Sequence, residues 1–309
     1  MTGPLDGTLM GRHDALLLDL DGVVYEDDHP VAGAVAAIEA VRAAGVPVRF
    51  VTNNASRTPA QVADRLRRLG VPAEPEEVLG SAQAAAHLLA GRDDVPDGAS
   101  VGVVGGEGLL AALRDVGLDP ALARDLDAAP SALVQGFSPD LGWLDLAAGT
   151  RWVREGVLWV ATNLDLTYPS SLGIAPGNGL MVHAVATAAG RRPDAVAGKP
   201  LPHLFRTAAE AAAARSPLVV GDRLDTDLAG AVAAGHTGAL VLTGVHGVDD
   251  ALAAEVDERP HVLLRDLGEL VDPAALARVD ERTAVLRQAW ADSGATPEAR
   301  ERLDRSLGT

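Results

Sequence analysis

The sequence contains no cysteine and only one lysine, Lys199, among its 26 basic residues. The absence of cysteine excludes disulfide bonds, thiolate metal ligands and thiol nucleophiles. Aromatic residues are also few, with two Tyr, three Phe and four Trp, which disfavours an aromatic-lined pocket for a pyridoxal ring or a nucleobase. Because arginine is used at every other basic position, we expect position 199 to need a compact ammonium that a guanidinium cannot imitate. Chance retention of a single lysine is the alternative.

The chain also lacks positive net charge and long apolar runs. Its formal net charge is −17, so we expect neither nucleic acid nor an anionic membrane as a partner, because both repel an acidic protein. No segment reaches the roughly 18 uninterrupted apolar residues of a membrane span, and Met1 to Arg12 has no apolar core of the kind found in signal peptides. These features predict a soluble cytoplasmic protein.

What is present is a repeated alternation of short apolar strands and helices, in a chain of 309 residues that exceeds what one core usually needs. The order strand, helix, strand, helix over the first 80 residues is typical of a parallel sheet. This rhythm restarts between about residues 80 and 190 and then returns. The later segments are strands at 101–104, 131–134, 157–161, 217–221 and 239–242, and helices at 202–215 and 228–234.

The pattern predicts an α/β protein whose Rossmann-like, doubly wound parallel-sheet core is interrupted by a large inserted α/β domain. We place the core at residues 1–80 and 191–272 and the insertion at 81–190. Residues 273–309 form a helical tail that could pack on the core, make an oligomer contact or fray. We expect Trp143 and Trp152 to pack inside the inserted domain rather than to serve as stacking platforms.

The first candidate catalytic residues, Asp19 and Asp21, stand at the end of the first predicted strand. Side chains alternate along a strand, so these two carboxylates point to the same side, and ligands of such sheets bind beyond the carboxyl ends of the strands. Two acids this close favour either a divalent cation such as Mg²⁺ or one protonated carboxyl group that serves as a general acid. A carboxylate beside Mg²⁺ can also act as a nucleophile. The alternative is a solvated strand end with an Asp-Gly turn.

Two further strands end in polar groups, the first at Thr52-Asn53-Asn54 and the second at Gly221-Asp222. Because the ends of parallel strands converge, we expect these groups and Lys199 to share one site with the first pair of acids. The inventory suits phosphoryl transfer, in which positioning and charge neutralisation supply most of the catalysis. The histidines lack metal-ligand spacing, and we interpret four of them as surface or core residues: His183, His203, His236 and His246.

Four segments, in this order, resemble the four motifs of haloacid dehalogenase superfamily phosphatases: Asp19-Leu20-Asp21-Gly22-Val23, Thr52-Asn53-Asn54, Gly198-Lys199-Pro200 and Gly221-Asp222-Arg223-Leu224-Asp225-Thr226-Asp227. The insertion resembles the subgroup with a large α/β cap, which includes phosphoglycolate, glycerol-3-phosphate and pyridoxal-phosphate phosphatases. Two segments look like that subgroup's return from cap to core: Ala161-Thr162-Asn163-Leu164-Asp165 and Pro176-Gly177-Asn178-Gly179. The likeness runs from about Asp14 to Leu270.

The resemblance implies that Asp19 is the nucleophile and that Asp21 is the acid that protonates the leaving alcohol and then activates water. Mg²⁺ would be held by Asp19, the backbone carbonyl of Asp21 and Asp222. Asp227 would orient the lysine or a metal-bound water, with Asp225 a weaker candidate for the same shell.

The phosphoryl oxygens would be bound by Thr52, the backbone amide of Asn53 and Lys199. Asn54 is a further candidate for substrate binding, although a structural turn suits this residue better. For Asn163 and Asp165, capping of the hinge between cap and core is the simpler interpretation.

The sequence thus predicts Mg²⁺-dependent hydrolysis of small phosphate monoesters through an aspartyl-phosphate, with glycerol 3-phosphate or 2-phosphoglycolate as the preferred substrate. A pyridoxal-phosphate or nucleotide phosphatase, a phosphotransferase or mutase, and a non-catalytic module that binds phosphorylated metabolites are the alternatives. The expected partner is a small phosphorylated metabolite, and a homodimer is possible.

Overall fold

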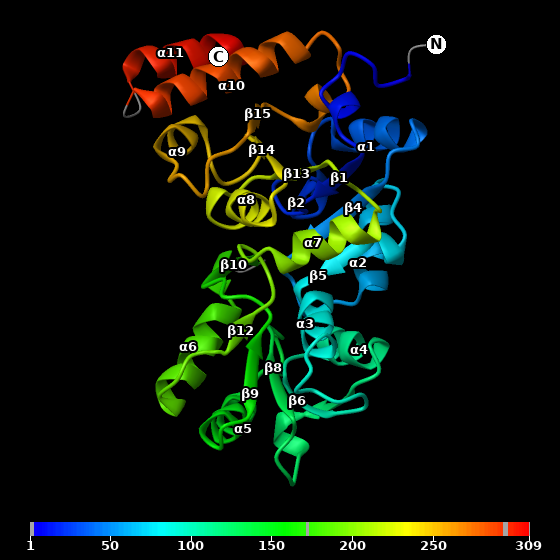
Figure 1. The fold of residues 1–309 in the computed structure, drawn as a ribbon, viewed down its shortest axis with the longest axis vertical. Helices are drawn as coiled ribbons and strands as arrows, with labels where there is room; N and C mark the ends of the chain where they lie inside the picture. Colours follow the sequence, from blue (N-terminus) through cyan, green and yellow to red (C-terminus); the bar gives the residue numbers. More distant parts are fainter. Residues whose placement is uncertain (1–2, 171–172, 293–295, 309) are drawn as a thin grey trace. The chain divides into compact units, whose positions relative to one another are not determined.

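The structure, a computed structural model, describes residues 3–170, 173–292 and 296–308. The chain forms two compact units, which we describe separately (Figure 1). Unit 1 comprises Met1–Val51, Ala63–Val78 and Pro200–Thr309, and unit 2 comprises Thr52–Val62 and Leu79–Lys199. The second unit is therefore made from segments that interrupt the first.

Unit 1 is built on six strands: β1 (Ala15–Leu18), β4 (Val48–Thr52), β5 (Val78–Gly80), β13 (Pro217–Gly221), β14 (Thr237–Val241) and β15 (Val262–Leu264). Their order in the sheet is β15-β14-β13-β1-β4-β5, and the pairs β1–β13, β1–β4, β13–β14 and β14–β15 are parallel. Every residue of β1 and β13 is buried, which explains why both segments are continuous apolar runs. The predicted α/β fold with a parallel core sheet is confirmed.

Strand β1 occupies the point where the strand order changes direction. The chain proceeds from β1 to β4 on one side, whereas β13 lies against the other side of β1 and leads on to β14 and β15. Ligands of open α/β sheets bind at such a switch point, beyond the carboxyl ends of the strands. The residues that follow β1 and β13 therefore stand where a site is expected.

The α-helices of unit 1 within the described residues, of which α2 also extends into unit 2, are α1 (Ala34–Ala43), α2 (Pro59–Arg68), α7 (His203–Ala211), α8 (Ala229–Ala234), α9 (Val248–Ala253), α10 (Leu276–Ala291) and α11 (Pro297–Leu307). A short hairpin, β2 (Tyr25–Glu26) with β3 (His29–Pro30), follows β1. Helix α7 ends at Ala211 rather than at the predicted Arg215, because Ala213 takes a left-handed conformation with φ 52°.

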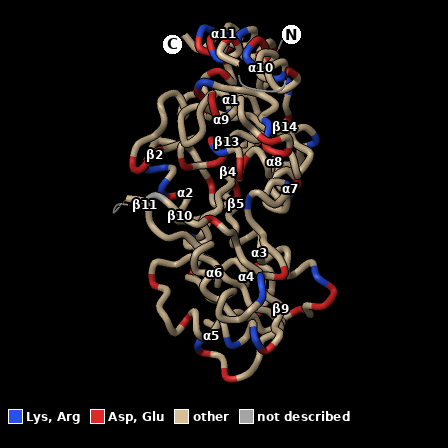
Figure 2. Tube along the Cα trace, turned by 90° about the vertical axis from the view of Figure 1, so that its left-hand side faces the viewer, with Lys and Arg blue, Asp and Glu red and all other residues tan. Residues whose placement is uncertain are grey.

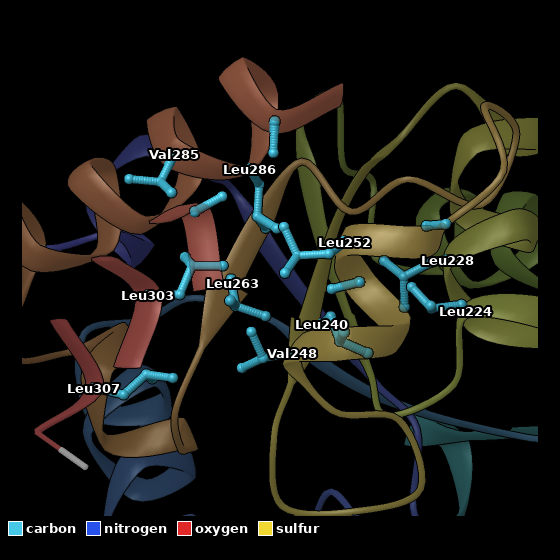
Figure 3. Close-up of a cluster of buried hydrophobic side chains, with 14 residues drawn as sticks. Leu224, Leu228, Leu240, Val248, Leu252, Leu263, Val285, Leu286, Leu303 and Leu307 are labelled. Carbon is cyan, nitrogen blue, oxygen red and sulfur yellow. The ribbon is translucent and has the colours of Figure 1, made fainter. Parts of the chain in front are cut away.

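The tail helices pack on unit 1. Val285 and Leu286 of α10 and Leu303 of α11 are buried in one cluster with Leu240 of β14 and Leu263 of β15 (Figure 3). Full burial of each such side chain contributes about 1.5–3 kcal/mol. Of the three fates that the sequence left open for the tail, packing on the core is the one observed for its described residues.

Unit 2 contains a second sheet, made of β6 (Ser100–Val104), β7 (Asp119–Leu122), β8 (Ala132–Gln135), β9 (Leu158–Ala161) and β12 (Ala195–Val196). The order is β12-β9-β8-β6-β7, and all four pairs are parallel. Its helices are α3 (Ser81–Ala90), α4 (Glu107–Asp115), α5 (Trp143–Arg154) and α6 (Asn178–Ala189), with α5 and α6 on one side of the sheet and α3 and α4 on the other (Figure 1). An antiparallel hairpin, β10 (Thr167–Ser170) and β11 (Gly173–Pro176), precedes α6.

The two tryptophans of α5 differ in burial. Trp152 is buried and its Nε1 donates a hydrogen bond to the carbonyl of Ala123, as predicted. Trp143 is 78% exposed, so its predicted packing is wrong. The buried positions of α5 follow Asp145 at helical spacing, and Trp143, two residues before Asp145, falls on the opposite side of the helix.

No helix among the described residues is long and apolar enough to cross a membrane. Acidic and basic residues are interspersed along the trace of both units (Figure 2).

Candidate functional site

Three buried carboxylates gather where β1 and β13 end. Asp19 follows β1, Asp222 follows β13, and Asp227 lies in a π-helical turn, η4 (Leu224–Leu228). One oxygen of each carboxylate lies within 4.8 Å of the other two, and the residues are only 9%, 2% and 1% exposed. Three like charges this close, shielded from water, are strongly unfavourable unless positive charge or a proton offsets them. Carboxylate oxygens are the ligands that a hard divalent cation prefers.

Glycines allow these acids to approach the backbone. A Cβ added to Gly22 or to Gly244 would overlap the carboxylate of Asp222, and one added to Gly221 would overlap Asp227. Gly22 also has φ 76°, a left-handed conformation that side chains other than hydrogen resist. Packing thus explains the glycines of the pairs Asp21-Gly22 in the first motif and Gly221-Asp222 in the fourth.

A loop after β14 holds Asp222 in place. The backbone N–H of Val245 donates to Asp222 Oδ2 at 2.8 Å, and the N–H of His246 donates to the carbonyl of Asp222 at 3.0 Å. His246 Nδ1 accepts from the N–H of Leu224 at 2.8 Å, and Thr243 Oγ1 donates to the carbonyl of Gly22 at 2.7 Å. No role for this loop was predicted from the sequence, where His246 was interpreted as a surface or core residue. The loop could have been recognised, because β14 is another parallel strand that ends at the same edge of the sheet.

Asp21 differs from Asp19 in its surroundings. Its side chain is exposed, and the turn that follows is closed by a hydrogen bond from the N–H of Gly22 to the carbonyl of Tyr25 at 2.8 Å. A buried acid and an exposed acid, two residues apart, can perform different tasks. An exposed carboxylate can exchange protons with water, which suits an acid and base.

Asp225 and Asp227 also separate. Asp225 makes a two-pronged ion pair with Arg223, at 3.0 and 2.7 Å, and its side chain is 48% exposed. Partial burial raises the pKa of Asp225, but the bonds to Arg223 and the nearby His246 outweigh it and leave the pKa below its ordinary value. Asp227 instead turns inward and accepts from the N–H of Arg223 at 3.2 Å. Of the two residues predicted to support the site, Asp227 joins the carboxylate group and Asp225 binds Arg223.

The other predicted residues lie in unit 2. Thr52, the last residue of β4, is buried and its Oγ1 accepts from the N–H of Asn54 at 3.1 Å. Asn54 Oδ1 accepts from the N–H and the hydroxyl of Ser56, both at 2.8 Å, which is the turn geometry that the sequence favoured for it. Lys199 is 4% exposed, and its backbone is hydrogen-bonded to the side chain of Asn53.

Comparison with known proteins identifies the relatives of this chain. A haloacid dehalogenase-like hydrolase model matches residues 16–119, and a related HAD-hydrolase-like model matches residues 196–270. D-glycerol 3-phosphate phosphatase of Mycobacterium tuberculosis is 47% identical over 268 residues, which cover 87% of this chain and 74% of that protein. The chain belongs to the haloacid dehalogenase-like hydrolase family. Acid sugar phosphatase of Staphylococcus aureus is 34% identical over 264 residues, 85% of this chain and 98% of that one.

A solved structure of this hydrolase family has the same fold. The glycerol phosphate phosphatase from M. tuberculosis in complex with magnesium matches with a TM-score of 0.86 and 41% identity, over 97% of this chain and 99% of that chain. The two matched segments contain every predicted site residue, whereas residues 120–195, which belong to unit 2, lie outside both family models. The predicted site residues therefore all lie in segments that the hydrolase family models match.

Proposed function

We propose that this protein is a Mg²⁺-dependent phosphatase that hydrolyses glycerol 3-phosphate or a closely related small phosphate monoester. The observation that carries the proposal is the buried group of Asp19, Asp222 and Asp227 at the sheet's switch point. The 47% identity to a D-glycerol 3-phosphate phosphatase supports the substrate class.

The carboxylate group fits a divalent cation. Asp19 and Asp222 would hold Mg²⁺ together with the backbone carbonyl of Asp21, and Asp227 would either join them or bind a water of the ion. The ion would neutralise part of the charge that the carboxylates and an incoming phosphate bring together.

In the first half of the reaction, one carboxylate oxygen of Asp19 attacks phosphorus and the bond from phosphorus to the alcohol oxygen breaks. Asp21, in its protonated form, gives its proton to the departing alkoxide, so that the alcohol leaves neutral. The product on the protein is an aspartyl-phosphate at Asp19.

In the second half, Asp21 is a carboxylate and takes a proton from a water molecule. The water oxygen attacks phosphorus, the bond from phosphorus to Asp19 breaks, and inorganic phosphate leaves. The cycle returns Asp19 to a free carboxylate and Asp21 to its protonated form, so atoms and protons balance.

Thr52, the backbone N–H of Asn53 and the ammonium of Lys199 would bind the phosphoryl oxygens. Their chemistry is suited to the task, since a hydroxyl, an amide and one compact cation can all donate to oxygens whose charge shifts during transfer. Asn54 is assigned a structural role instead, because Ser56 occupies its carbonyl oxygen.

Substrate choice would reside in unit 2, in the predicted cap segment at residues 81–190. The chain has few aromatic residues, and its two relatives are a D-glycerol 3-phosphate phosphatase and an acid sugar phosphatase. Both observations favour a small polyol or sugar phosphate as substrate over pyridoxal phosphate or a nucleotide. A cytoplasmic location and a homodimer remain predictions from the sequence.

Phosphate release from a substrate panel tests the proposal. The panel contains glycerol 3-phosphate, 2-phosphoglycolate, glucose 6-phosphate, pyridoxal 5′-phosphate, a nucleoside monophosphate and an aryl phosphate. We expect glycerol 3-phosphate to have the highest kcat/KM, and we expect replacement of Mg²⁺ by EDTA to reduce its turnover about 100-fold, since a metal supplies several kcal/mol to such reactions. Restoring Mg²⁺ is the control, because it should recover the activity.

Binding of glycerol 3-phosphate without release of phosphate from any panel member would overturn the hydrolase assignment and favour the binding-module alternative. Transfer of the phosphoryl group to an added sugar, with little free phosphate, would indicate a phosphotransferase.

Gly244→Ala tests whether the loop after β14 sets the metal site. The new methyl group would overlap the Asp222 carboxylate, so either Asp222 or the loop that holds it must move. We expect about tenfold lower kcat and about a tenfold higher Mg²⁺ concentration for half-maximal activity, because metal ligands need fixed positions. Gly247→Ala is the matched control, since its Cβ would meet only Asp250 Oδ2, at 3.8 Å. Equal behaviour of the two variants would contradict the role of the loop.

A further inference from the structure

The side chain of Asn53 holds the backbone of Lys199 from both sides. Asn53 Oδ1 accepts from the N–H of Lys199 at 2.9 Å, and Asn53 Nδ2 donates to the carbonyl of Lys199 at 3.1 Å. One amide thus replaces the two bonds that a neighbouring strand would make to the same residue. Because Lys199 is the only lysine and is buried, this pair of bonds fixes the backbone that carries the only lysine ammonium of the chain.

The backbone of Gly198, the residue before Lys199, is also held in place. The N–H of Gly198 donates to the carbonyl of Thr162 at 2.7 Å. A Cβ at Gly198 would lie 2.5 Å from Asn53 Oδ1 and 2.6 Å from the Thr162 carbonyl oxygen. The approach of the Asn53 amide to Lys199 therefore requires glycine at position 198, which gives the Gly-Lys pair of the third motif a geometric reason.

Asp165 fixes the direction of the Asn53 amide. Asn53 Nδ2 also donates to Asp165 Oδ2, at 3.0 Å. A carboxylate only accepts, so it selects the NH₂ end of the amide and leaves Oδ1 for the N–H of Lys199. An amide turned the other way would place its oxygen against Asp165 and the Lys199 carbonyl, with three acceptors facing one another.

Asp165 is itself anchored by the start of α6. Its carbonyl accepts from the N–H of Gly179 at 2.8 Å, and its N–H donates to Asn163 Oδ1 at 3.2 Å. Side chains at positions 177 and 179 would overlap the backbone of residues 164–166. The two glycines before and after Asn178 therefore let α6 support the loop that carries Asp165.

The backbone of Asn53 is held as well. Its carbonyl accepts from Ser81 Oγ at 2.6 Å and from Asn163 Nδ2 at 2.7 Å. Both ends of Asn53 are thus fixed by residues of unit 2 that come from separate segments of the chain. Such a network is what a site needs when a charged group must be placed to within a fraction of an ångström.

We propose that Asp165 is a positioning residue for phosphoryl transfer, acting on Lys199 through the side chain of Asn53. The inference rests on the proposed function and adds to it a task for Asp165 and for the Asn53 side chain, beyond phosphate binding by the Asn53 backbone. Capping of the hinge is the simpler role considered for Asp165. It does not explain why a side chain that can only accept hydrogen bonds lies opposite the amide of Asn53.

Exchange of the two side chains provides the test. In Asn53→Asp, a carboxylate faces Asp165 and the Lys199 carbonyl, and we expect kcat for glycerol 3-phosphate to fall about 30-fold with a smaller change in KM, since small displacements of catalytic groups have effects of this size. In Asn53→Asp with Asp165→Asn, the new amide can donate to the new carboxylate. We expect the double variant to recover at least about fivefold of the loss, because one of the two repulsive contacts is removed.

Single substitutions of Asp165 complete the series. Asp165→Asn keeps a carbonyl acceptor for Asn53 and should remain within about threefold of wild-type kcat, whereas Asp165→Ala removes the acceptor and should lose about tenfold. Asp127→Asn, an exposed carboxylate of the same unit, is the matched control. Thermal unfolding of each variant separates a positioning defect from a folding defect.

The outcomes are distinguishable. If the double variant is slower than Asn53→Asp, the two residues act independently and the positioning inference is wrong, while the phosphatase assignment stands on the wild-type rate. If Asp165→Ala keeps the wild-type kcat, the inference is likewise wrong. Failure of wild type and Asp127→Asn to release phosphate would overturn the proposed function and the inference with it.

Discussion

Asp19→Asn should abolish phosphate release, with a loss of at least about 10⁴-fold in kcat, comparable to removal of a nucleophile in other covalent hydrolases. The substitution keeps the size of the side chain and removes its nucleophilic charge. It also removes one of the three buried carboxylates that lie within 4.8 Å of one another. We therefore expect the variant to gain less stability from added Mg²⁺ than wild type does.

The matched control is Asp225→Asn. Asp225 belongs to the same fourth motif as Asp222 and Asp227, but its carboxylate is bound to Arg223 and about half exposed. Its replacement should change kcat by less than about threefold, because exposed ion pairs contribute little. Turnover by Asp19→Asn above one per cent of wild type would show that another group is the nucleophile.

The core strands could be predicted from the sequence because they are buried on both faces. Segments such as 217–221 are short, apolar and closed by glycine, and few other structures suit them. The end of α7 could not be predicted in the same way. Residues 211–214 are all alanine, with no glycine or proline to mark a stop, and the helix ends near Ala213, which takes a left-handed conformation that the sequence does not indicate.

Part of the carboxylate group was equally visible, since Asp19 and Asp222 each follow a strand of one parallel sheet. The inward turn of Asp227 was not, because it depends on the π-helical turn at Leu224–Leu228, for which spacing gives no pattern. The structural role of His246 was not predicted, because metal-ligand spacing was the only pattern considered for the histidines. In the structure, its ring nitrogen accepts a backbone hydrogen bond. The clamp on Lys199 joins residues 53, 165 and 199, and only the folded chain brings such distant positions together.

Arg282→Ala should destabilise the protein by about 3–5 kcal/mol, as expected when one partner of a buried ion pair is lost. Arg282 on α10 is fully buried and its Nη2 binds Glu269 Oε2, which also accepts from the N–H of Arg265 at 3.0 Å. Arg282 Nε and Nη1 and Glu269 Oε1 have no partner among the described residues. Removal of the guanidinium would leave Glu269, which is 2% exposed, without its ion-pair partner, and urea unfolding measures the cost.

The companion variant, Arg282→Met with Glu269→Leu, decides what the pair contributes. Apolar replacement of both partners of a buried pair is often neutral or stabilising, because the desolvation of two ions is no longer required. We therefore expect the double variant to recover most of the stability lost in Arg282→Ala. Arg278→Ala, an exposed position on the same helix, should change stability by less than about 0.5 kcal/mol. A double variant as unstable as Arg282→Ala would mean that Arg282 stabilises α10 through the packing of its aliphatic stem and not through the charge of its guanidinium.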